Sequence, residues 1–182
     1  KQKGITLSRP LPLLNHYTIP LINTLYNKIN RAKAPFILPV MQGHFTFSNK
    51  NFYLQGYGST GFIEHQVLIP NAAIKSYCSE LIKLINKHSL PIGLTTVKKF
   101  TGKKRSLNYN GSGYSFALHV PNKKPYLKLL EHLDEINTDH LGITSLYKDA
   151  RVPLSVIQKQ YPSLDEFRNR LIKYDKRRLW TN

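Results

Sequence analysis

The feature that most limits the fold of this chain is an ordered series of strand-like and helix-like segments that begins near residue 62. The pattern from Phe62 to Ile69 predicts a strand that ends at Pro70. Apolar residues then recur with helical spacing from Ile74 to Ile85, and two strand-like runs follow at 92–100 and 114–120. A second apolar helical face and a short strand-like segment at 143–147 complete the series. The residues predicted on that second face are Leu127, Leu130, Leu133 and Ile136.

The order strand, helix, strand, strand, helix, strand predicts an α+β fold: an antiparallel sheet with helices on one face and a ferredoxin-like split βαβ core. The two helices would cover one face of the sheet and leave the other face free to bind a ligand. We expect Asn71 to cap the first of these helices.

The flanking segments are less regular. Residues 1–56 are predicted to form an N-terminal arm and an aromatic-rich loop, with one helix at 21–29, and residues 57–182 to form the main domain. Near the C-terminus, Pro153 suits the first turn of a helix over 153–160. Ser163 and Glu166 match a capping box that opens a last helix ending near Tyr174.

Composition narrows the classes of partner. The chain has 27 basic and 10 acidic residues, a net charge of +17, which favours an anionic partner or a strongly solvated surface. The single cysteine, Cys78, excludes an internal disulfide and argues against a cysteine-based zinc site. The first residues lack the apolar core of a signal peptide, so we expect a cytoplasmic protein. Because Lys1 stands where an initiator methionine would be, we expect that the chain was processed or begins within a longer protein.

Catalytic motifs that would make an enzyme complete are missing from the sequence. Gly56 to Gly61 fits G-x-G-x-x-G, but it precedes a strand instead of joining a strand to a helix. The seven histidines show no metal-ligand spacing, and we expect residues such as His44, His65 and His119 to be surface or strand residues. No metal site is predicted.

One alternative is a basic module that binds RNA or single-stranded nucleic acid. Gly113, Tyr114 and Phe116 overlay part of the RNA-recognition signature, although its leading basic residue and final aromatic residue are missing. The basic turn 103–105 would suit phosphates, or simply a solvated hairpin. We rank this alternative second.

Two segments combine positive charge with a β context. Lys98 and Lys99 lie on opposite faces of a predicted strand, so one of them should face the sheet interior or a cleft. The run 147–151 is densely charged and, taken alone, reads as a salt-bridged surface turn.

In this order, these segments resemble the C-terminal substrate (cap) domain of decaprenylphosphoryl-β-D-ribose oxidases and related FAD-linked oxidases of the vanillyl-alcohol-oxidase type. The resemblance covers residues 57–178 and only loosely the residues before them. The segments that carry it are 57–66, Val97 to Phe100, Tyr114 to Asn122, Leu146 to Arg151, Tyr161 to Phe167 and Lys173 to Asp175.

The resemblance implies oxidation of a sugar or alcohol carbon by hydride transfer to FAD. Lys148 matches a catalytic lysine beside the flavin and the substrate, and Ser145 matches a position close to the flavin. Gln66 and Lys98 match substrate-binding positions. Further pocket positions fall on Glu64, Ser115 and Ala117.

The pocket departs from the family pattern. Glu64 replaces a second glutamine, Ser115 and Ala117 replace an asparagine and a cysteine, and Ser145 replaces a tyrosine. The ribose oxidases' own substrate is therefore not assigned, and an anionic or phosphorylated polyol is one candidate. A remnant that keeps the fold without the chemistry is another alternative.

The resemblance also implies partners. Most of the FAD would be held by an N-terminal domain absent from this chain, in the same protein or a neighbouring one. We expect the chain to be inactive alone, and an association with the membrane periphery is compatible with its charge.

Overall fold

The sheet has the predicted topology. The computed structural model describes residues 9–33, 37, 39–40, 51–104, 106–148 and 151–177. Its strands are β1 (Phe62–Pro70), β2 (Leu94–Phe100), β3 (Gly113–Pro121) and β4 (Ile143–Thr144), arranged in the order β2-β3-β1-β4. All three neighbouring pairs are antiparallel. Since β3 lies between β1 and β2, the expected α+β fold with a split βαβ core is confirmed.

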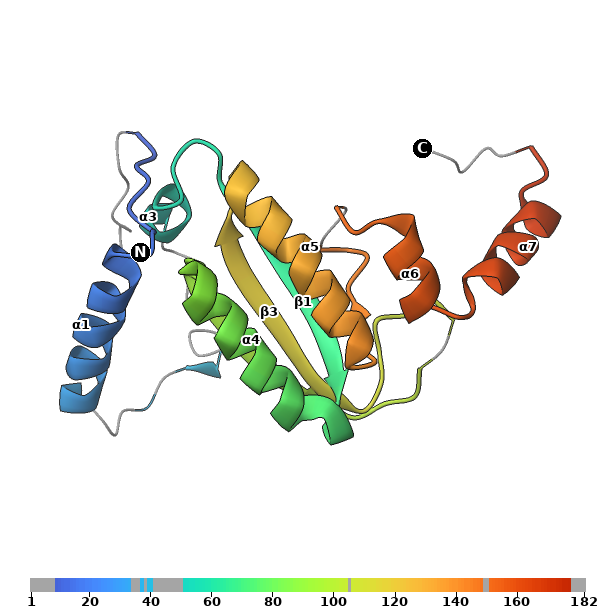
Figure 1. The fold of residues 1–182 in the computed structure, drawn as a ribbon, viewed down its shortest axis with the longest axis horizontal. Coiled ribbons are helices and arrows are strands. Elements are labelled where there is room, and N and C mark those ends of the chain that lie inside the picture. Colours follow the sequence, from blue (N-terminus) through green and yellow to red (C-terminus); the bar gives the residue numbers. More distant parts are fainter. Residues whose placement is uncertain are drawn as a thin grey trace.

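Two helices cover one face of this sheet. They are α4 (Ile74–His88) and α5 (Lys124–Asp139), which lie side by side across β1 and β3 (Figure 1). The predicted inner face of α5 is confirmed, because Leu130 and Leu133 are fully buried and Leu127 and Ile136 pack against them. Each fully buried side chain of this size contributes about 1.5–3 kcal/mol. The other central core residues are Val67, Ile69, Tyr77, Leu81, Leu84, Leu90, Phe116, Leu118 and Val120.

The two predicted helix caps are not formed. Asn71 opens a short 3-10 turn, Asn71–Ala73, so α4 begins later, with Ala73 at its N-cap and no side-chain bond there. Ser163 is the N-cap of α7 (Leu164–Tyr174), but it makes no side-chain cap either. The carboxylate of Glu166 bonds instead to Arg170 one turn later, which removes it from a capping box. The helix before α7 is α6 (Leu154–Gln160), with Pro153 at its N-cap.

The end of α5 turns the chain into β4. Leu141 adopts a positive φ of 56°, and its amide and that of Gly142 donate to the carbonyls of Thr138 and Asn137. This is the pattern of a Schellman motif with leucine at the position that usually holds glycine. Gly142 is needed for a different reason: a Cβ there would lie 2.7 Å from the Asn137 carbonyl oxygen and 2.8 Å from Ile69 Cδ1.

The described residues of the N-terminal region include the helices α1 (Thr18–Lys33) and α3 (Asn51–Gln55). α1 is longer than the helix predicted at 21–29, because Asn15 Oδ1 accepts a bond from the Thr18 amide and starts the helix earlier. α3 lies in the segment predicted as an aromatic loop. Backbone bonds from Leu11 and Leu14 tie the arm to the end of α3. The aromatic residues at 36, 45 and 47 lie outside the described residues, and the division at 56/57 stays a prediction.

Candidate functional site

The site is built on the sheet face opposite α4 and α5. Pairing places residues of the three longer strands side by side in three rows, and alternation along each strand puts all three rows on this face. Successive rows are about 7 Å apart along a strand. The rows are Leu94, His119 and Glu64; Thr96, Ala117 and Gln66; and Lys98, Ser115 and Leu68.

Two further predicted residues reach this face from the chain after β4. The amide of Ser145 donates to the Gln66 carbonyl at 2.8 Å, which extends the pairing between β1 and β4 by one bond. Lys148 Nζ lies 3.3 Å from Glu64 Oε2. The structure thus brings all seven predicted site residues to one side of the sheet, although Glu64 and Lys148 are 84 positions apart in the sequence.

The seven residues fall into two groups by their exposure to solvent. Ser115, Ala117 and Ser145 are buried, whereas Glu64 and Gln66 are partly exposed and Lys98 and Lys148 are exposed. Ser115 Oγ bonds to the Tyr109 hydroxyl at 2.8 Å and accepts from Gln66 Nε2 at 3.3 Å. A ligand therefore reaches Ser115 only if Tyr109 moves aside.

The prediction that Lys98 or Lys99 faces the sheet interior or a cleft is wrong. Lys98 lies on the candidate face and Lys99 on the opposite side, as alternation requires. Neither faces the interior or a closed cleft, because both are exposed on β2, which is an edge strand of the sheet. Lys98 can thus contact a ligand without the buried partner that an enclosed lysine would need.

Residues that sequence analysis did not select surround Glu64. His119 Nε2 lies 3.6 Å from Glu64 Oε2, and its Nδ1 lies 2.8 Å from the Tyr53 hydroxyl. Tyr53 in turn contacts the Tyr57 hydroxyl at 2.5 Å. His119 is a strand residue, as expected. Because it alternates with Ser115 and Ala117 along β3, the sequence could have placed it on the same face as those two predicted site residues.

Burial controls the protonation of this cluster. Burial raises the pKa of Tyr53 to about 12. Two smaller effects act on the same pKa: the hydrogen bond with Tyr57 lowers it, and the negative charge of Glu64 raises it. Burial also raises the pKa of Tyr57. The pKa of His119 is lowered, chiefly by burial and also by Lys148, against the opposing effect of Glu64. All three groups are therefore neutral near pH 7.

In the charged run 147–151, Lys148 and Arg151 form salt bridges, as expected of a salt-bridged turn, but the pair of Arg151 is largely buried. Arg151 makes a two-pronged bond to Asp134 of α5, at 2.7 and 3.1 Å, and Asp134 is only 1% exposed. His65 lies 3.5 Å from the Arg151 guanidinium and 2.8 Å from Asn137. This pair anchors the chain shortly after Lys148. Residues 149 and 150 lie outside the described residues.

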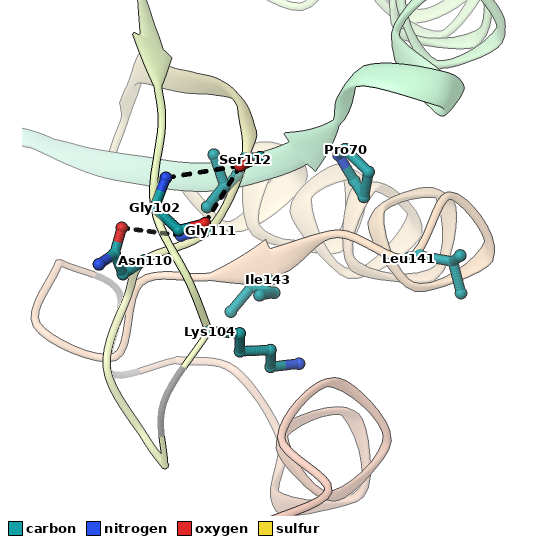
Figure 2. A pocket seen from close by; sticks show the side chains of 9 residues that line it. Pro70, Gly102, Lys104, Asn110, Gly111, Ser112, Leu141 and Ile143 are labelled. Atoms are coloured by element: carbon teal, nitrogen blue, oxygen red, sulfur yellow. Dashed lines mark hydrogen bonds between the residues drawn. The ribbon is translucent and has the colours of Figure 1, made fainter.

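A loop closes the far end of the face. Lys104, in the loop between β2 and β3, donates to the Gln160 carbonyl at 2.7 Å, and burial lowers its pKa. A pocket of about 220 Å³ opens beneath this loop, with Lys104, Asn110 and Leu141 among its lining residues (Figure 2). None of the seven predicted site residues lines it, although Leu68, which does, pairs with Ser115. Arg105, the third residue of the basic turn, lies outside the described residues.

The aromatic residues needed for RNA binding are on the wrong face. Phe116 is buried in the core beneath α4, 5.2 Å from the Tyr77 ring, and Tyr114 packs against the same core. Side chains in these positions cannot stack on bases, so the partial match to the RNA-recognition signature was coincidental.

The described residues hold no candidate for a metal site or for a membrane-spanning helix. Within these parts of the chain, no group of three or more His, Cys, Asp and Glu side chains could hold a metal ion. No helix in the same residues is long and apolar enough to cross a membrane.

The comparisons with known proteins include a distant relative. No protein-family model matches the chain. It is 21% identical over 159 residues to decaprenylphosphoryl-beta-D-ribose oxidase from Mycolicibacterium smegmatis (strain ATCC 700084 / mc(2)155). The match covers 87% of this chain but 34% of the relative, so the chain spans about a third of the relative's length. The similarity supports a distant relationship to an oxidase, the class to which the sequence motifs pointed.

Proposed function

We propose that this chain is the substrate-binding domain of an FAD-dependent oxidoreductase that oxidises a sugar or alcohol carbon. The observation that carries the proposal is the gathering of Glu64, Gln66, Lys98 and Lys148 on one sheet face from segments far apart in the sequence. The distant similarity to an oxidase also supports it. When bound, the FAD would accept a hydride from the substrate carbon.

Lys148 is the residue best suited to lie beside the flavin. Its side chain is 48% exposed, so its ammonium can contact a cofactor held by another domain. A cation there stabilises the negative charge that arises when the flavin is reduced. Ser145 is buried in this structure, so its contribution would be to shape the chain that presents Lys148 rather than to contact the cofactor.

The polar side chains of the face are suited to a hydroxyl-rich substrate. Gln66 has an amide that both donates and accepts, and Lys98 supplies an exposed cation two strands away. Ser115 and Ala117 lie between them and form the floor. Together they would orient a polyol, with Lys98 available for a phosphate or another anionic substituent.

The partner domain would bind the FAD and cover the apolar surface that this chain exposes. One side of α1 carries large apolar residues at helical spacing, namely Leu21, Ile22, Leu25, Tyr26 and Ile29, each more than 40% exposed. Such a contiguous apolar stripe is typical of an interaction surface. The relative's additional length leaves room for a flavin domain in a protein of this kind.

The decisive experiment is to produce the chain together with the flavin-binding part of its protein and record a visible absorption spectrum. We expect a yellow complex with bound FAD and a colourless preparation of the chain alone. Lys148→Met should then lower the flavin reduction potential, while Lys128→Met, which removes a lysine from α5 instead, should leave it unchanged. A colourless complex would refute the proposal.

A further inference from the structure

A series of aromatic and imidazole side chains ends on Glu64. The Tyr57 and Tyr53 hydroxyls are 2.5 Å apart, and the Tyr53 hydroxyl is 2.8 Å from His119 Nδ1. The other imidazole nitrogen, Nε2, is 3.6 Å from Glu64 Oε2, which is also 3.3 Å from Lys148 Nζ. The series joins α3, β3, β1 and the chain after β4 at one end of the candidate face.

The bonds in this series have a consistent direction. Both phenols keep their protons because burial raises the pKa of each. A carboxylate only accepts hydrogen bonds, so a neutral His119 carries its hydrogen on Nε2, which faces Glu64. The other nitrogen, Nδ1, then accepts from the Tyr53 hydroxyl, which leaves the Tyr53 oxygen to accept from Tyr57. The Glu64 oxygen Oε2 therefore faces the Nε2–H of His119 at 3.6 Å and the Lys148 ammonium at 3.3 Å.

The imidazole has little freedom to turn away. The ring of Phe62 stacks on His119 with 4.5 Å between ring centroids and an angle of 26°. Tyr57 is 1% exposed, and a Cβ at Gly93 would lie 2.2 Å from its hydroxyl oxygen, so only glycine allows this packing. Packing of this kind fixes a side chain in one rotamer, which is what a positioning residue needs.

Glu64 keeps one oxygen for a ligand. Both of its polar contacts with described residues use Oε2, and its side chain is 26% exposed. A carboxylate only accepts hydrogen bonds, whereas the amide of the neighbouring Gln66 both donates and accepts. This end of the face therefore favours a ligand hydroxyl and repels a ligand carboxylate or phosphate.

We propose that His119, oriented by Tyr53 and Tyr57, is a positioning residue that holds the Glu64 carboxylate against Lys148, so that Glu64 Oε1 accepts a hydrogen bond from a neutral ligand hydroxyl. The identification of that ligand as substrate rests on the proposed function. Its specificity follows from the chemistry of the carboxylate: the substrate enters with an uncharged polyol end towards Glu64, and any anionic group lies elsewhere.

The positioning role is tested on the chain alone by nitrogen NMR of its histidines, with His119→Gln used to assign the signal. We expect the Nε2–H tautomer for His119, and we expect Tyr53→Phe to shift its Nδ1 resonance. Tyr161→Phe is the matched control, since it removes a phenol that donates to the Thr144 carbonyl at 2.6 Å. A Nδ1–H tautomer, or equal shifts in the two variants, would overturn the role of His119.

The ligand preference is tested by titrating the chain with an aldonate, which keeps one uncharged end, and with the corresponding aldarate, which has a carboxylate at both ends, following backbone amide shifts in β1 and β3. Both compounds can place one carboxylate near Lys98, so we expect the aldonate to bind at least about tenfold more tightly, a difference of about 1.4 kcal/mol. Glu64→Gln should remove most of this preference by relieving the repulsion of the second carboxylate of the aldarate. Equal binding of both compounds to the unaltered chain, or binding of neither, would overturn the role of Glu64.

Neither measurement uses FAD, so their outcomes are separable from the proposed function. A complex without flavin that keeps the tautomer and the preference for an uncharged polyol end would reject the oxidoreductase and retain a polyol site. A yellow complex that lacks both the expected tautomer and the ligand preference would reject the site proposed for Glu64 and leave the proposed flavoprotein function standing.

Discussion

Two ion pairs close to each other in the sequence are built in opposite ways. Lys148 meets Glu64 through a single 3.3 Å contact, with 48% and 26% of the two side chains exposed. Arg151, three positions later, holds Asp134 with two bonds, and the exposed fractions are 16% and 1%. The first pair lies on the candidate face, and the second lies between α5 and the chain that follows β4.

The difference separates anchoring from function. A buried carboxylate must be fully paired, because its desolvation is costly, so Asp134 fixes Arg151 in one position. An exposed pair gains little from its contact and can exchange it for a ligand. The buried pair therefore holds the chain near the site in place, while Lys148 and Glu64 remain able to respond to what binds.

The largest expected effect comes from breaking the buried pair. Asp134→Ala leaves the guanidinium of Arg151 partly buried without its carboxylate, and we expect a loss of about 3–5 kcal/mol in the free energy of unfolding. Urea denaturation measures this loss. Glu64→Ala is the matched control and should cost less than about 1 kcal/mol. Similar losses in the two variants would show that the pairs do not differ in kind.

The sequence was sufficient for the order of the elements because that order depends on local signals. Apolar spacing from Ile74 to Ile85 and the turn signals at Pro70 and Pro91 act within one segment each. The predicted caps failed because a cap depends on where the first turn begins and on competing partners, such as Arg170 for Glu166. Those choices depend on side-chain geometry that a pattern does not contain.

The candidate site could be predicted only in part. Alternation places Glu64, Gln66, Ser115 and Ala117 on one face once the pairing of the strands is known, and the resemblance added Lys148. The contact between Tyr53 and His119 spans 66 positions and has no local signal. Asp134, in contrast, did carry a local sequence signal, because an acidic residue beside the inner leucines of a helix needs a buried partner.

Alkaline pH should unfold the chain through the tyrosines near the site. The pKa of Tyr53 is raised to about 12 and that of Tyr57 is raised as well, so the unfolded state loses these protons first. The resulting stability is fully present below pH 10 and falls as pH rises towards 12, by up to about 1.4 kcal/mol per pH unit for each tyrosine. Phenolate absorbance should rise in a cooperative step as unfolding releases Tyr53 and Tyr57. A single smooth titration would contradict this.

Acidic pH should lower the free energy of unfolding through His119. Its pKa lies below the ordinary value of 6.5, so the unfolded state takes up this proton first and stability falls as pH decreases below about 6.5. One proton accounts for at most about 1.4 kcal/mol per pH unit. His119→Gln should flatten this part of the stability curve, whereas His132→Gln, at an exposed position of α5, should not. If both variants follow the original curve, His119 is not the responsible group.

The smallest expected effect is the coupling between Glu64 and Lys148 in a double-mutant cycle. With Glu64→Gln, Lys148→Met and the double variant, we expect a coupling free energy below about 1 kcal/mol that decreases at high salt, since both side chains are in contact with solvent. The proposed role of Lys148 requires a weak coupling, because a lysine that turns towards a reduced cofactor must be able to leave Glu64. A coupling of several kcal/mol that resists salt would mean that the pair is structural, like Arg151 and Asp134, and would remove Lys148 from the proposed chemistry.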